Sequence, residues 1–213
     1  MLALPTDCSG VVHVGANDGR ERTTYAALRL PVLWIEALPE SYQRLLSNLN
    51  GYSQQDALCA LITDEPGRQY AFHVSSNSGR SSSIFELGQH KDTWPDVFYV
   101  EETALTSSTL EQVLPTLVEP YNTLVLDVQG AELLVLRGAG TRLHQFKYIH
   151  LEAADYPAYT NACLLGEVAA WLLAKGYHEV AREAFGWHPS GTGAYYNILF
   201  TRAAGAPDPT VAQ

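Results

Sequence analysis

Cysteine is scarce in this 213-residue chain, which contains Cys8, Cys59 and Cys163. They are odd in number, widely separated and without a C-x-x-C spacing, so neither a disulfide framework nor a zinc site is indicated. We expect reduced, buried thiols.

Basic residues are also few. The 13 Lys and Arg are outnumbered by 23 Asp and Glu, which gives a net charge of −10. Because affinity for nucleic acid depends on cationic side chains, this balance argues against a nucleic-acid partner.

Long apolar runs are missing as well. No run approaches the roughly 20 residues needed to span a bilayer, and the N-terminus lacks a basic segment followed by an apolar one. We therefore expect a cytoplasmic protein with no membrane partner. A hydrophobic content of 46% suffices for one sizeable core, so residues 1–202 are expected to form a single domain, and residues 203–213, rich in Ala and Pro, a flexible tail.

The most informative segment that is present is the glycine-punctuated turn 15–19, which follows the apolar run Val11–Val14 and precedes the helix-like segment Arg20–Leu30. Gly15 and Gly19 allow a sharp turn and a close approach to a ligand, and the helix after it offers free N–H groups. The G-x-N-x-G spacing departs from the dinucleotide pattern G-x-G-x-x-G, which favours a nucleoside ligand. An ordinary strand-to-helix turn is the alternative.

A carboxylate follows at the expected distance. The second apolar run, Val32–Ile35, ends in Glu36. A carboxylate about 20 residues after the glycine turn can accept both hydroxyls of a ribose. The alternatives are a solvated strand end or a cap for the helix after Pro39.

Three blocks of residues together resemble a known family. They are Gly15-Ala16-Asn17-Asp18-Gly19, Glu36-Ala37-Leu38-Pro39 with Tyr42, Leu45 and Asn48, and Leu126-Asp127-Val128-Gln129-Gly130-Ala131-Glu132 with Leu136, Gly138 and Ala139. In this order they resemble the FkbM-type methyltransferases over about residues 10–202, and the third block is the most specific. The resemblance implies a class I fold that uses S-adenosylmethionine, usually for O-methylation of a hydroxyl on a small molecule, sugar or glycan.

The resemblance also assigns roles to individual residues. It implies a cofactor site made of His13, Gly15, Ala16, Asn17, Gly19, Glu36, Ala37, Leu61 and Asp127. One position departs from the family pattern, because His13 stands where an acidic residue is common. Asp127 is the nearest candidate to receive the cofactor's ammonium instead. No N/D-P-P-Y/F tetrapeptide, which marks enzymes that methylate base amines, is present.

Strand-like and helix-like segments alternate along the chain. Strands are predicted at Val11–Val14, Val32–Glu36, Ala57–Ile62, Gln69–Ser75, Leu124–Val128, Tyr148–Ala153, His178–Glu183 and Tyr195–Thr201, and helices at Arg20–Leu30, Glu40–Asn50, Thr109–Val118, Ala131–Phe146 and Ala162–Lys175. This alternation predicts an α/β, Rossmann-like fold with a mainly parallel sheet and helices on both faces. The connection 186–193 is too short for a crossover helix, so the last strand should be antiparallel.

The segment 75–108 fits this alternation least well and is predicted to be an inserted loop region. Insertions of this length in a compact domain are often lids or binding loops. Asn77, Arg80 and Ser82 could donate hydrogen bonds to a hydroxyl-rich or carboxylate-bearing substrate. A surface excursion whose aromatic residues pack locally is the alternative.

The chemistry is expected at the carboxyl ends of the strands, where open α/β sheets bind ligands. Asp127 and Glu152 end neighbouring strands, and His150 shares a face with Glu152. Trp187 is a substrate-binding candidate and His188 a catalytic one, both in the hairpin before the last strand. His150 and His188 are the candidate bases, with Asp127 or Glu152 orienting them or serving instead, and His73 is a weaker candidate.

Each of these residues also has a structural alternative. Asp127 could cap the following helix, His150 and Glu152 could form a buried hydrogen bond, and Glu132 is best explained by its place in a helical first turn. No metal is expected, although Asp127 and Glu152 could hold a divalent ion. A nucleotide-dependent oxidoreductase and a non-catalytic cofactor-binding protein remain the alternative functions.

Overall fold

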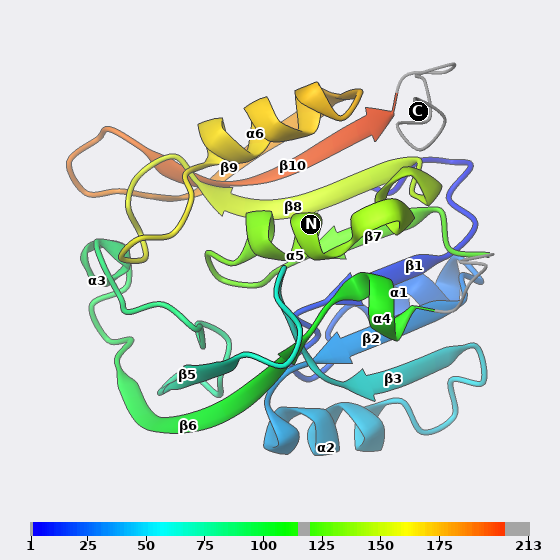
Figure 1. Cartoon of the computed structure of the whole chain (residues 1–213), viewed down its shortest axis with the longest axis horizontal. Helices are drawn as coiled ribbons and strands as arrows, with labels where there is room; N and C mark the ends of the chain where they lie inside the picture. The colour runs from blue at the N-terminus through cyan, green and yellow to red at the C-terminus, as the bar shows by residue number, and fades with distance from the viewer. Residues whose placement is uncertain (1, 115–119, 203–213) are drawn as a thin grey trace.

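A seven-stranded sheet forms the centre of the computed structural model, which describes residues 2–114 and 120–202. Its order is β3-β2-β1-β7-β8-β10-β9 (Figure 1). The strands are β1 (Val11–Val14), β2 (Val32–Glu36), β3 (Gln55–Cys59), β7 (Thr123–Leu126), β8 (Tyr148–Ala154), β9 (Tyr177–Trp187) and β10 (Ala194–Arg202). The first five are mutually parallel, whereas β10 runs antiparallel to both β8 and β9. The predicted α/β fold with an antiparallel last strand is therefore confirmed.

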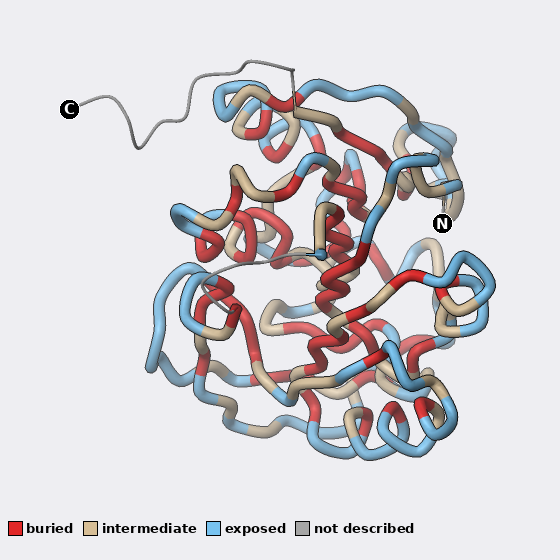
Figure 2. The backbone as a smooth tube through the Cα atoms, turned by 90° about the vertical axis from the view of Figure 1, so that its right-hand side faces the viewer, coloured by how far each residue is buried: buried red, intermediate tan, exposed pale blue. Residues whose placement is uncertain are grey.

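Helices cover both faces of this sheet because successive side chains of each strand point to opposite sides. Val12 and Leu124 pack in one cluster with α4 (Leu110–Val113), α5 (Glu132–Gly138), α6 (Leu165–Ala174) and the 3₁₀ helix η1 (Gly140–Gln145). Val11 and Val125 face the other cluster, which contains α1 (Arg22–Ala27) and α2 (Pro39–Asn48). The buried segments run through the middle of the molecule in Figure 2.

A second, three-stranded sheet corrects two of the predictions. It consists of β4 (Leu61–Ile62), β5 (Gln69–Ser75) and β6 (Tyr99–Ser108), with β6 in the middle. The predicted strand Ala57–Ile62 is therefore two strands in different sheets, and the predicted loop region 75–108 contains a ten-residue strand as well as the short helix α3 (His90–Thr93). Most of β6 is exposed or half-buried and lacks the alternating apolar pattern, so its pairing with β5 left no local signal.

The predicted helices exist but differ in extent. The segment Ala131–Phe146 is broken, because α5 ends at Gly138 and the chain continues as η1 from Gly140, whose φ is 51°. A Cβ at Gly138 would lie 2.0 Å from the carbonyl oxygen of Thr63, so this glycine lets α5 pack closely on the chain after β4. The start of the predicted helix Thr109–Val118 is seen as α4, whereas residues 115–118 of that prediction and the predicted tail 203–213 lie outside the described residues.

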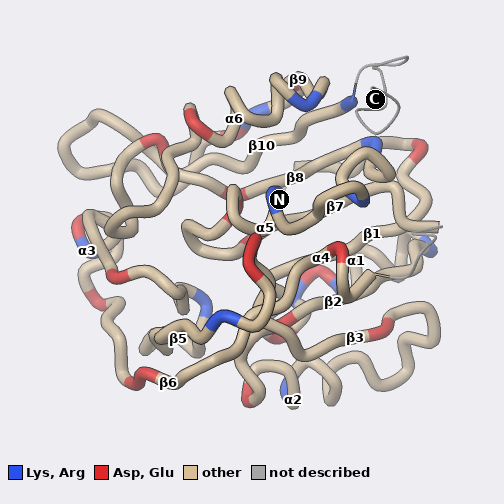
Figure 3. The backbone as a smooth tube through the Cα atoms, viewed as in Figure 1, with Lys and Arg blue, Asp and Glu red and all other residues tan. Residues whose placement is uncertain are grey.

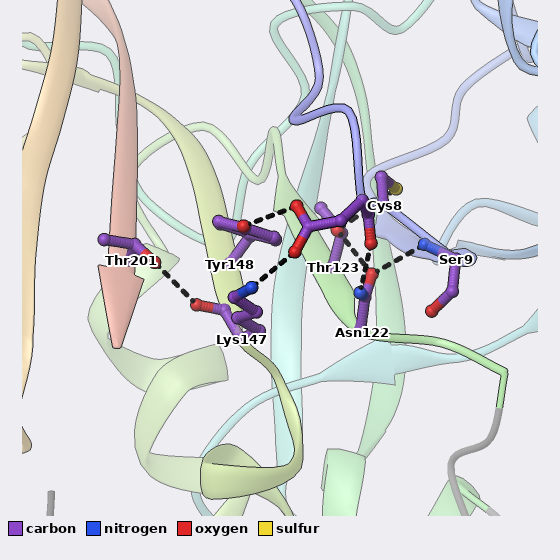
Figure 4. Close-up of polar contacts among 8 residues, drawn as sticks. Cys8, Ser9, Asn122, Thr123, Lys147, Tyr148 and Thr201 are labelled. Carbon is purple, nitrogen blue, oxygen red and sulfur yellow. Dashed lines mark hydrogen bonds and ion pairs between the residues drawn. The ribbon is translucent and has the colours of Figure 1, made fainter. Parts of the chain in front are cut away.

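The amino-terminal segment is fastened at the edge opposite the carboxyl ends of the parallel strands. Tyr148 donates its hydroxyl to Asp7 at 2.6 Å and the Lys147 ammonium is also bonded to Asp7, while Asn122 donates to the Asp7 carbonyl oxygen at 2.9 Å. Asn122, Lys147 and Tyr148 gather at the start of β7 and β8 in Figure 4. This edge is occupied by structural contacts.

Two further sequence predictions concern exposure. Cys8 and Cys163 are half-buried, but Cys59 is exposed at the end of edge strand β3, so the expectation that all thiols are buried was wrong for this residue. Within residues 2–114 and 120–202, no helix combines the length and apolar character needed to cross a membrane.

Candidate active site

A cavity of about 420 Å³ opens at the carboxyl edge of the main sheet. Its volume lies within the range of about 300–1,000 Å³ that is typical of small-molecule sites. Many residues predicted to bind cofactor or substrate or to act in catalysis line it: His13, Gly15, Ala16, Asn17, Glu36, Ala37, Leu61, Asn77, Arg80, Ser82, Asp127 and Glu152. The structure thus brings together residues that lie more than a hundred positions apart in the chain.

The glycine turn forms one wall of this cavity. Gly15 adopts a φ of 85° and donates its N–H to the carbonyl oxygen of Ile35 at 2.9 Å. A Cβ at Gly15 would lie 1.8 Å from the carbonyl oxygen of Asp127, so only glycine lets the turn lie against the end of β7. Gly19 is buried beside Leu45 of α2 and is absent from the cavity lining, so it shapes the turn from behind.

Glu36 is held firmly at the end of β2. One carboxylate oxygen accepts the N–H of Asn17 at 2.7 Å and the other accepts the N–H of Leu38 at 2.8 Å. Burial raises the pKa of Glu36, while these two hydrogen bonds oppose the rise. Each oxygen keeps a further lone pair, so the group can still accept hydroxyl donors from a ligand in the cavity.

Asp127 and Glu152 stand level on neighbouring strands. Leu126 of β7 is paired with Leu151 of β8, so the residues that directly follow them, Asp127 and Glu152, lie side by side at the sheet edge. Burial raises the pKa of both carboxyl groups, and the charge of Asp127 raises that of Glu152 further. Two buried carboxylates that repel each other gain from a cationic ligand, so this wall favours a positive charge in the cavity.

Gln129 and Glu132 support this wall from the loop after β7. The Gln129 amide donates to Asp127 at 2.5 Å, and its carbonyl oxygen accepts the Tyr159 hydroxyl at 2.6 Å. Glu132 is 2% exposed in the first turn of α5, where it accepts the N–H of Gly130 at 3.1 Å, and burial raises its pKa to about 7. Glu132 therefore fixes the start of the helix, as its position in the sequence indicated.

His13 lies beneath the glycine turn as an uncharged group. Its ring stacks on Trp34 with a centroid distance of 4.8 Å, and its Nδ1 lies 3.1 Å from the Tyr25 hydroxyl. Burial lowers the pKa of His13 to about 3, so the imidazole is neutral at physiological pH. It cannot replace an acidic side chain electrostatically, whereas the carboxyl groups of Asp127 and Glu152 line the same cavity.

His150 lies away from the cavity. It is level with Val125 and His13, two residues before the edge at which Glu152 lies. Its Nε2 accepts the N–H of Leu2 at 3.4 Å, and burial lowers its pKa to about 3. The structure therefore does not bring this candidate base to the cavity, although the side chain is on the face that was predicted.

The hairpin between β9 and β10 sits at the carboxyl edge, as its topology predicts. Neither Trp187 nor His188 lines the cavity, however. Trp187 is 62% exposed. The His188 ring is held by the Ser190 hydroxyl at 2.7 Å and by Asp92 at 3.3 Å, so it ties the hairpin to α3.

The serine-rich loop 76–83, which follows β5, lies over the glycine turn. Its own side chains hold it together, because Ser82 Oγ accepts the N–H of Ser75 at 3.0 Å and the Asn77 amide donates to Ser81 at 3.0 Å. Asn17 donates to the carbonyl oxygen of Ser78 at 3.1 Å, which joins the loop to the turn. Asn77 and Ser82 thus line the cavity as parts of the loop framework.

Arg80 and His73 are the remaining candidates that the sequence predicted for the site. Arg80 lines the cavity with its guanidinium 3.9 Å from Asp18. His73 stacks on Tyr99 at 4.8 Å, lies 3.6 Å from Glu86 and 3.5 Å from Glu102, and is absent from the lining.

Four aromatic residues that sequence reasoning missed line the other end of the cavity: His90, Trp94, Phe185 and Tyr195. His90 and Trp94 belong to the insertion, in and directly after α3, and Phe185 and Tyr195 face each other across the β9–β10 pair. The aromatic residues around Trp94 were the one visible signal, but nothing local in the sequence indicated where they pack. Within the described ranges, no group of three or more His, Cys, Asp or Glu is placed to hold a metal.

Comparison with known proteins identifies the family of this chain. The family model described as the methyltransferase FkbM domain matches residues 13–179, so the chain belongs to that family and the resemblance of the three blocks is confirmed. A search of curated protein sequences found no match. Membership makes the chain an S-adenosylmethionine-dependent methyltransferase, with S-adenosylmethionine as the methyl donor.

Solved structures show the same fold at low sequence identity. Fibrillarin, a pre-rRNA processing protein from Methanococcus jannaschii, is 13% identical with a TM-score of 0.54, covering 94% of this chain and 70% of that one. Magnesium protoporphyrin IX methyltransferase from Synechocystis PCC 6803, with bound S-adenosylhomocysteine, is 9% identical with a TM-score of 0.52, covering 93% and 76%. Aeropyrum pernix fibrillarin with bound S-adenosylmethionine is 12% identical with a TM-score of 0.50, covering 94% and 70%.

Proposed function

We propose that this protein transfers the methyl group of S-adenosylmethionine to a hydroxyl group of a small molecule, sugar or glycan. The observation that carries the proposal is the single cavity in which Glu36, Asp127 and Glu152 meet the glycine turn. The methyl donor contains a nucleoside and positively charged groups. Glu36 is available for the ribose of the nucleoside, and Asp127 and Glu152 are available for the positive charge.

The residues present fit such a donor. Glu36 would accept the ribose hydroxyls, Ala37, Leu61 and Phe72 would contact the adenine, and Asp127 would accept the ammonium. All of these line the cavity. When bound, the donor supplies an activated methyl group, so the protein has to align the acceptor, exclude water and receive a proton.

Proton removal is needed because a neutral hydroxyl is a weak nucleophile. Asp127 and Glu152 line the cavity and are less acidic than ordinary carboxyl groups, so they can either orient the group that receives the proton or receive it themselves. His150 and His188 do not reach the cavity, so we assign them no part in this step.

A nucleic-acid acceptor is disfavoured by charge. Lys and Arg are spread over several elements in Figure 3 rather than gathered along one of them, and the chain carries a net charge of −10. Binding of a polyphosphate backbone depends on a concentrated basic surface. This supports a small-molecule or glycan acceptor.

The test is methyl transfer from S-adenosylmethionine with a deuterated methyl group to a panel of alcohols, phenols, methyl glycosides, amines and short RNAs. Mass spectrometry should locate the label on oxygen, and Asp127→Asn should abolish transfer while exposed Asp56→Asn retains it. Label found only on nitrogen or only on RNA would overturn the proposal.

A further inference from the structure

The aromatic end of the cavity is built around α3, whose position is fixed by backbone hydrogen bonds. The N–H groups of Gly88 and His90 donate to the carbonyl oxygen of Ala158 at 2.8 and 3.0 Å, and the N–H of Gln89 donates to that of Pro157 at 3.0 Å. A Cβ at Gly88 would lie 2.5 Å from the Pro157 oxygen, so glycine is needed for this close approach. The helix is thereby clamped against the chain that follows β8.

This clamp holds His90 and Trp94 in an aromatic cluster. The ring of His90 lies 4.8 Å from that of Trp94 and 6.2 Å from that of Tyr195, and Trp94 lies 5.0 Å from Tyr195. Gly186 of β9 makes room for the indole, because a Cβ there would lie 2.6 Å from its outer edge. Elements distant in sequence therefore converge on one ring-lined wall of the cavity.

His90 combines burial, an unpartnered ring nitrogen and a place in the cavity lining, whereas His150, whose Nδ1 is also unpartnered, lies outside that lining. His90 is 2% exposed, it lines the cavity, and its Nδ1 has no hydrogen-bond partner among the described residues. His13, which also lines the cavity, is bonded to Tyr25 and stacked on Trp34 beneath the glycine turn. A buried polar group without a partner is costly, which indicates a ligand-binding part for His90.

We propose that the aromatic pocket formed by His90, Trp94, Phe185 and Tyr195 binds the acceptor as a ring that carries the hydroxyl group, and that His90 receives the hydroxyl proton. This inference rests on the proposed O-methylation and names the substrate class and the base. A flat ring face suits a wall of aromatic side chains, whether the ring is a phenol or the C–H face of a pyranose.

The chemical step balances with the residues present. The acceptor oxygen forms a bond to the methyl carbon while the bond from that carbon to sulfur breaks and its electron pair stays on sulfur. The hydroxyl proton passes to the imidazole of His90, which becomes an imidazolium and later releases the proton to water. Burial lowers the pKa of His90 to about 4, so the imidazole is unprotonated at neutral pH.

The first experiment measures binding without turnover. Protein with labelled histidine and tryptophan rings, saturated with S-adenosylhomocysteine, is titrated by NMR with catechol, methyl β-D-glucopyranoside and 1,2-propanediol. One of the two ring compounds should shift the His90 and Trp94 signals saturably, and which one does so distinguishes an aromatic from a saturated ring. If neither ring compound shifts the His90 and Trp94 signals, or if the acyclic diol shifts them equally, the pocket assignment is overturned.

The second experiment separates binding from proton transfer. With the ring compound that binds, His90→Gln should lower kcat by about 100-fold or more with little change in KM. Trp94→Leu should mainly raise KM, by about tenfold, and the exposed His178→Gln should match the wild type. Unchanged turnover in His90→Gln would contradict His90 as the base. A bound ring compound that the wild type does not methylate would contradict the pocket as the acceptor site.

The two proposals can fail separately. Methylation found only on nitrogen would refute O-methylation whatever binds beside His90. Methylated hydroxyl products with silent His90 and Trp94 signals would refute only the present inference.

Discussion

At the scale of single residues, the proposed recognition of the donor rests on Glu36. Both of its oxygens are buried and already hold the turn through Asn17 and Leu38. Glu36→Ala removes the acceptor for the ribose and leaves two N–H groups without partners. S-adenosylmethionine binding should weaken by about 1–3 kcal/mol in titration calorimetry.

The matched control for this substitution is Glu40→Ala, because Glu40 is an exposed carboxylate in the first turn of α2. It should bind like the wild type. Equal affinity of Glu36→Ala and Glu40→Ala would remove Glu36 from the site.

Asp127 is expected to favour donor binding while lowering the stability of the unliganded protein. Burial raises the pKa of Asp127 to about 6, so ionising this carboxyl group costs more in the folded protein than in the unfolded chain. For a group whose folded-state pKa is raised, the stabilising contribution is full below the unfolded pKa of about 4 and is lost as pH rises through the folded pKa. Asp127→Asn should therefore stabilise the unliganded protein at pH 7, by roughly 1–3 kcal/mol, and change it little at pH 4.

Thermal unfolding at the two pH values checks this, alongside calorimetry of S-adenosylmethionine. The same substitution should weaken donor binding at pH 7, because the cation loses an ionised partner. A variant that is less stable than the wild type at pH 7 would contradict a desolvated carboxylate at this position.

At the scale of elements, the contact between the glycine turn and the end of β7 holds the cavity together. Gly15→Ala meets both an unfavourable φ of 85° and a Cβ 1.8 Å from a backbone oxygen. Gly51→Ala offers a matched control, because Gly51 has a φ of 93° and nothing within 4 Å of the added Cβ. The difference between the two variants isolates the clash from the backbone strain.

Chemical denaturation should show a loss of about 1 kcal/mol for Gly51→Ala and on the order of 3 kcal/mol or more for Gly15→Ala. Similar losses in both variants would mean that the turn and the end of β7 do not pack as closely as described.

The elements also show how far sequence reasoning reaches. Strands β1, β2, β7 and β8 were predictable because each is a short apolar run, and their parallel order then placed Asp127 and Glu152 together at one edge. Strand β6 was not predictable, because its exposed Glu101 and Glu102 break the apolar pattern and it pairs with β4 and β5 in a sheet separate from the main one. His90 was missed for a related reason, since its place depends on backbone hydrogen bonds to residues 157 and 158.

At the scale of the whole molecule, the proposed methyl transfer requires no metal ion. The acceptor proton has carboxylate and imidazole groups to receive it in the cavity lining. Activity on an identified acceptor should survive EDTA and should not rise on addition of Mg²⁺ or Mn²⁺. Loss of turnover on chelation, restored by either ion, would replace this mechanism with one in which Asp127 and Glu152 hold a metal against the acceptor oxygen.

The central claim is that the cavity at the carboxyl edge is a site for S-adenosylmethionine. The most direct measurement is titration calorimetry of the wild-type protein with S-adenosylmethionine and, in parallel, with NAD⁺. The account predicts saturable binding of one S-adenosylmethionine per chain and no binding of NAD⁺. Binding of NAD⁺ without binding of S-adenosylmethionine would contradict this claim and would indicate that the glycine turn binds a dinucleotide.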